Sequence, residues 1–63
     1  MAHEYFQFRV TLIFGGDWCP QLPPKSFIVN AKDGDNAIEV ATSDATAMGY
    51  KRGWIVEHQV EVL

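Results

Sequence analysis

The sequence predicts an α+β fold, with a three-stranded antiparallel sheet and one helix packed on one face of it. Two stretches in which apolar and polar residues alternate, 4–14 and 54–62, indicate strands near the two ends of the chain. Between them, residues 36–48 repeat alanine at every fourth position, which is typical of a helix that lies close to a sheet. A chain of 63 residues has room for one domain, which we take to span residues 1–63.

The first strand, 4–14, carries the clearest pattern. From Phe6 onward its even positions are all apolar and should face the core: Phe6, Phe8, Val10, Leu12 and Phe14. Gly15-Gly16 should end this strand, and the three prolines within 15–25 favour a loop there. A second strand is expected at 26–31. The first strand is the longest and most apolar, so we expect it in the middle of the sheet, with strand order 2-1-3 and the helix reached by a right-handed crossover.

The helix should be capped by Asp33 or Asp35 and should end at Gly49, which suits the residue after a helix C-terminus. The third strand is expected to turn one set of side chains toward the helix: Trp54, Val56, His58, Val60 and Val62. The other set, which includes Ile55 and the two glutamates, should lie on the open face of the sheet.

Charge and cysteine content restrict the partners. The net charge of −3 is uneven: three basic and two acidic residues in 1–32 leave +1, whereas two basic and six acidic residues in 33–63 leave −4. A mildly acidic domain lacks the basic footprint of a nucleic-acid binder. No stretch is long and apolar enough for a membrane span, and the N-terminus does not read as a signal peptide. One cysteine is the usage of a reducing compartment, so we expect a cytoplasmic protein.

Each motif that resembles a catalytic or metal-binding site lacks residues that the site requires. Trp18-Cys19 resembles the start of the thioredoxin active site, but Leu22 occupies the position of its second cysteine. A lone cysteine nucleophile would need a base, for which only His3 and His58 are candidates. The run 33–36 resembles a calcium loop, yet positions five, six and twelve do not match. We therefore expect no enzyme activity, no metal and no cofactor.

Three surfaces are candidates for a protein partner. The proline-rich loop carries Trp18 and Leu22, and tryptophan is enriched at binding hot spots. The alternative for Trp18 is that it folds back and plugs the end of a small core. The open sheet face should present Tyr5, Arg9, Ile13, Ile28 and Ile55, and it could also dimerise. The acidic helix face, with Glu39 and Asp44, would suit a basic partner.

Residues 27–41 form a strand that ends in Val-x-Ala, an acidic turn, and a helix that opens with Ala-x-x-x-Ala. With the flanking strands, this resembles the small β-β-α-β accessory proteins of phages and mobile elements, some of which are anti-CRISPR or other host-protein inhibitors. The resemblance implies a non-enzymatic protein that binds by occupying a partner's surface, as a monomer or a homodimer. The alternative is a self-assembling scaffold that uses its open sheet face.

Overall fold

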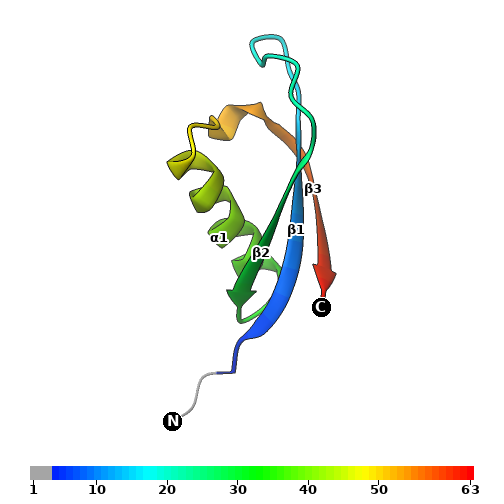
Figure 1. Ribbon diagram of the computed structural model, residues 1–63, viewed down its shortest axis with the longest axis vertical. Coiled ribbons are helices and arrows are strands. Elements are labelled where there is room, and N and C mark those ends of the chain that lie inside the picture. Colours follow the sequence, from blue (N-terminus) through cyan, green and yellow to red (C-terminus); the bar gives the residue numbers. More distant parts are fainter. Residues whose placement is uncertain (1–3) are drawn as a thin grey trace.

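The computed structural model describes residues 4–63, so expectations that involve residues 1–3, including the one for His3, lie outside the described residues. The chain forms β1 (Phe6–Phe14), β2 (Lys25–Ala31), helix α1 (Gly34–Ala47), a short 3-10 helix η1 (Arg52–Trp54) and β3 (Ile55–Val62). The sheet has the order β2-β1-β3 with antiparallel neighbours, and α1 lies on one face of it (Figure 1). The predicted fold class and strand order are therefore confirmed.

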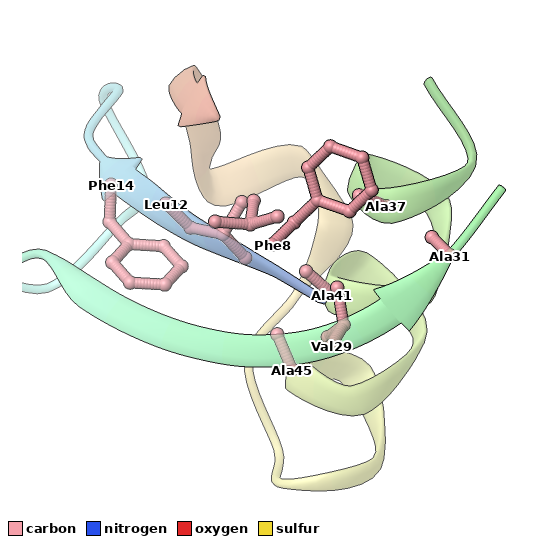
Figure 2. Close-up of a cluster of buried hydrophobic side chains, with 9 residues drawn as sticks. Phe8, Leu12, Phe14, Val29, Ala31, Ala37, Ala41 and Ala45 are labelled. Carbon is pink, nitrogen blue, oxygen red and sulfur yellow. The ribbon is translucent and has the colours of Figure 1, made fainter. Parts of the chain in front are cut away.

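β1 is the central strand, and its even side chains from Phe8 to Phe14 form most of the core, whereas Phe6, which was predicted to face the core, is 49% exposed. Phe8 lies opposite Val29 of β2 and Val62 of β3, and Val10 lies opposite Phe27 and Val60. The buried core consists of these side chains: Phe8, Val10, Leu12, Phe14, Val29, Ala31, Ala37, Ala41 and Ala45. Figure 2 shows the three helix alanines beside the larger side chains of the sheet, so small residues let α1 approach the sheet closely.

Both ends of α1 are capped as the sequence predicts. Asp33 Oδ1 accepts a hydrogen bond of 2.8 Å from the backbone N–H of Asn36, which satisfies one free amide of the first turn. At the other end Gly49 has a φ of 104°. This left-handed residue lets the N–H of Tyr50 donate to the carbonyl of Ala45 at 3.0 Å, as in a Schellman motif. The helix itself begins two residues earlier than the predicted 36–48.

β3 departs from the predicted alternation at its start. Ile13 pairs with Glu57 but Phe14 pairs with Ile55, so Val56 is an extra residue in a β-bulge. As a result Ile55 packs against the core and Val56 is exposed, whereas the sequence had predicted the reverse. Trp54 was also wrongly placed in the strand, since it belongs to η1. Similarly, β1 begins at Phe6, so Tyr5 precedes the strand.

The helix covers the sheet unevenly. α1 packs mainly against β2 and β1 (Figure 1), and every residue of β3 after Ile55 is exposed. No helix within residues 4–63 is long and apolar enough to cross a membrane.

Candidate protein-binding surface

The residues expected to contact a partner lie on three separate surfaces. Trp18 and Leu22 belong to the β1–β2 loop at one end of the sheet (Figure 1). Tyr5 precedes β1, and Arg9 and Ile28 are paired residues on the face opposite α1. The helix carries the other two, Glu39 and Asp44. A single compact partner would not contact all seven of these residues, because they lie on three separate surfaces.

Trp18 lies at the tip of the β1–β2 loop and is 93% exposed. The N–H of Cys19 donates to the carbonyl of Gly16 at 3.3 Å, which closes a tight turn around Asp17 and Trp18. Because the indole is almost fully in solvent, it does not plug the end of the core. The alternative interpretation of Trp18 is thus not what the structure shows.

Other aromatic residues close the core at this end. The rings of Phe14 and Tyr50 stack with centroids 4.7 Å apart and planes 10° from parallel. Trp54 is half-buried against the core, and the ammonium of Lys51 lies 5.9 Å from the centre of its ring. Leu22 reaches back from the loop to pack on the same cluster, which ties the base of the loop to the core.

A shallow hollow of about 330 Å³ lies beside the loop. It is lined by Pro20, Leu22, Met48, Gly49, Tyr50 and Trp54. We call the surface formed by this lining and by Trp18, which precedes the lining residue Pro20 by two positions in the same loop, the apolar end. Sequence reasoning found Trp18 and Leu22 but missed Met48, Tyr50 and Trp54. The available signal was the placement of Met48 at the predicted end of the helix and of Tyr50 and Trp54 soon after it, where the chain must return past the loop.

The open face of the sheet is more polar than expected. Ile28, Arg9 and Glu61 form a row across β2, β1 and β3. Arg9 Nη1 lies 2.7 Å from Glu61 Oε1, so this guanidinium already has a carboxylate partner. In the next row, the hydroxyls of Thr11 and Ser26 lie 2.9 Å apart and share a hydrogen bond. The apolar side chains on this face are separated by these polar rows.

The two helix carboxylates do not form one acidic patch. Glu39 and Asp44 are five residues apart, which places them about 140° apart around an α-helix. Glu39 lines a second hollow of about 280 Å³ between α1 and β3, together with Ile38, Thr42, Arg52, Ile55 and His58. Arg52 therefore accompanies Glu39, and the positive charge offsets the carboxylate.

Cys19 is half-buried, and its thiol donates to the carbonyl of Pro20 at 3.1 Å. Within residues 4–63, no group of three His, Cys, Asp or Glu side chains is placed to hold a metal ion. The loop cysteine therefore packs as a small apolar side chain.

Comparisons with protein-family models, with curated proteins and with solved structures return no match for this chain. The functional interpretation therefore depends on the geometry of the surfaces described above.

Proposed function

We propose that this protein is a protein-binding module that contacts its partner through the apolar end. The observation that carries the proposal is the 93% exposure of Trp18 on a loop whose base is packed on the core. Covering a large exposed aromatic side chain makes the free energy of binding more favourable, because its apolar area is removed from water. Tryptophan is accordingly among the residues most enriched at binding hot spots.

The loop is suited to binding because little of it has to be ordered. Cys19 and Leu22 pack against the core, and Pro20, Pro23 and Pro24 restrict the backbone between the turn and β2. A segment that is already held in one conformation loses less entropy when it binds. The Trp18 side chain is then presented from a stable base.

The surroundings of Trp18 indicate the chemistry of the partner. The hollow lined by Met48, Tyr50 and Trp54 can take an apolar side chain from the partner. The ammonium of Lys51 lies 5.9 Å from the centre of the Trp54 ring and supplies positive charge at this margin. The surface therefore suits a protein that offers an apolar pocket for the indole, an apolar side chain for the hollow, and an acidic rim.

The proposal extends to the form suggested by the resemblance, an inhibitor of a host protein in the cytoplasm. Such an inhibitor needs no chemistry of its own, since covering a partner's functional surface is sufficient. Self-assembly through the open sheet face has weaker support, because the Arg9–Glu61 ion pair and the Thr11–Ser26 hydrogen bond interrupt its apolar side chains.

The experiment is affinity capture with quantitative mass spectrometry, comparing wild type, Trp18→Ala and Ile28→Ala. Ile28 is the matched control, because it is an exposed apolar residue on a different surface. Loss of a hot-spot tryptophan costs about 2 kcal/mol or more, so affinity for the true partner should fall roughly 30-fold with Trp18→Ala. Ile28→Ala should bind as wild type does. Equal capture of every protein by all three would reject the apolar end as the binding surface.

The inhibitor form has its own test on any partner so identified. The partner's activity should fall when wild-type protein is added and should be unaffected by Trp18→Ala at the same concentration. Full partner activity in the presence of saturating wild-type protein would leave a binding module that does not inhibit.

A further inference from the structure

The two outer edges of the sheet are protected to different degrees. β2 is preceded by Pro23 and Pro24, has Lys25 at its start, is followed by Lys32, and lies beneath α1. Prolines, lysines and covering elements are the usual means by which an edge strand avoids pairing with another chain. β3 has a β-bulge at Val56 and carries Glu57 and Glu61, but it contains no proline and no lysine between Ile55 and Val62, and it is exposed after Ile55. β3 is thus the edge open to another strand.

The register shows which backbone groups β3 presents at this edge. The N–H of Leu63 donates to the carbonyl of Gln7 at 2.9 Å, so this pair is hydrogen-bonded to β1. Hydrogen-bonded and non-hydrogen-bonded pairs alternate in an antiparallel ladder. Glu61, Gln59 and Glu57 therefore also bond to β1. The N–H and C=O groups of the residues between them, His58, Val60 and Val62, point away from the sheet.

The same three residues turn their side chains toward the helix side of the sheet, where α1 covers them only in part: a methyl group added at Gly34, the first residue of α1, would lie 3.8 Å from Val60 Cγ1. Val60 is 38% exposed and Val62 is 66% exposed. The hollow that contains Ile38 and His58 continues this uncovered strip along α1. Unpaired backbone groups and exposed valines therefore occur on one strand, as expected for an edge that another strand covers.

We propose that the occupant is a second copy of this chain, paired antiparallel through β3 about a two-fold axis at Val60. This choice of register follows from the two glutamates of the strand. An axis at Gln59 would place Glu57 directly opposite Glu61 of the other copy, and an axis at Glu61 would place that residue opposite itself. Like charges directly opposite each other destabilise a sheet.

An axis at Val62 would overlap only residues 61–63 of the two copies, and an axis at His58 fails for a different reason. It would pair Val60 and Val62 with the bulged residue Val56 and with η1, where the regular ladder is lost. The axis at Val60 uses only regular strand. It pairs Val60 with its own copy, His58 with Val62, and Gln59 with Glu61, so no two carboxylates are opposed.

This arrangement gives hydrogen-bond partners to the outward-facing N–H and C=O groups of β3 in both copies. The outward-facing pairs would form about six backbone hydrogen bonds, two for each pair of residues. A two-fold axis perpendicular to the sheet keeps both helices on the same face, so the valines of the two strands lie between them. Glu61 keeps Arg9 as its partner and can also accept a hydrogen bond from the amide of Gln59 in the other copy.

The first test is the oligomeric state, measured by sedimentation equilibrium over a range of concentrations. Wild type should be a dimer, and Val60→Lys should weaken dimerisation on the order of 100-fold, because it opposes two lysines and removes two valines. The matched control is Ile28→Lys. Ile28 is an exposed apolar residue on β2, the opposite edge strand, so this variant should remain dimeric. Circular dichroism should show that both variants are folded. A monomeric wild type at high micromolar concentration, or an unaltered dimer with Val60→Lys, would overturn the proposal.

The second test is the register, measured by oxidative cross-linking in a Cys19→Ser background. With the axis at Val60, the two Cα atoms of a Val60→Cys variant would be about 5.5 Å apart, within the range that a disulfide spans. The two Cα atoms of Gln59→Cys would be more than about 7 Å apart and should not cross-link. Cross-linking of Gln59→Cys in preference to Val60→Cys would show that the register is wrong. The diagnostic substitutions of both tests lie in β3 and their readouts need no other protein, so their outcome is independent of the binding proposed for the apolar end.

Discussion

Replacing Leu12 by alanine should remove a large part of the stability of this domain. Leu12 is completely buried in the middle of β1, between Lys25 of β2 and His58 of β3. Substitution of a buried leucine by alanine costs about 2–5 kcal/mol, which includes the cavity that remains. A domain of 63 residues is stable by roughly 3–9 kcal/mol in total. Leu12→Ala should therefore leave the protein at the margin of folding.

The assay is urea unfolding followed by far-ultraviolet circular dichroism, with all proteins at the same concentration so that any association contributes equally. A small domain has a urea m-value near 1 kcal/mol per molar urea, so the midpoint should fall by about 2–5 M. The control is Ile13→Ala, one residue along the same strand. Ile13 is only half-buried and lies on the open face, so we expect a loss of about 1 kcal/mol.

The comparison between neighbours tests the reasoning on which the fold depends. If β1 turns its even residues to the core, the even position must lose more stability than the odd one. A midpoint shift for Ile13→Ala equal to or larger than that for Leu12→Ala would show that the faces of the central strand have been assigned the wrong way round.

Three further local features of the fold can be tested by substitution, each by thermal and urea unfolding. Gly49→Ala should cost about 1–2 kcal/mol because φ at this position is 104°, whereas Gly53→Ala, at a glycine without a positive φ and with no atom near its added methyl group, should cost less. Asp33→Ala should cost about 1 kcal/mol by removing the helix cap, and Asp33→Asn should restore most of it. Arg9→Ala should cost less than about 1 kcal/mol, because both members of its ion pair are solvent-exposed, and the loss should shrink further in 1 M salt.

Much of the fold could be predicted from the sequence because local and long-range preferences agree. The alternation of 6–14 has one apolar face, and a one-residue shift would turn that whole face to water. The alanines at 37, 41 and 45 are small and regularly spaced, so only one helix face can approach the sheet. Asp33 and Gly49 mark the helix ends through the backbone requirements of caps.

The details that could not be predicted depend on contacts between distant segments. Ile55 and Val56 are both β-branched and apolar, so nothing in their order shows which one the bulge turns inward. That choice is made by pairing with Phe14 and by the return of the chain through η1. Only Trp18 and Leu22 of the apolar end were predicted, for the same reason. Tyr50 and Trp54 follow α1 in the chain, and they meet Leu22 only after β2 and α1 have packed together.

The position of β1 has a consequence for the kinetics of the fold. It is the first strand in the chain, and one neighbour arrives early whereas the other arrives late: Arg9 and Glu61 are 52 positions apart. Bringing such distant segments together is slow, so in the monomer β3 should be the last strand to dock and the first to detach. Amide protons along β1 should then alternate in their rate of exchange with deuterium. Phe8 and Val10, bonded to β2, should exchange slowly, while Arg9 and Thr11, bonded to β3, should exchange each time that strand comes away.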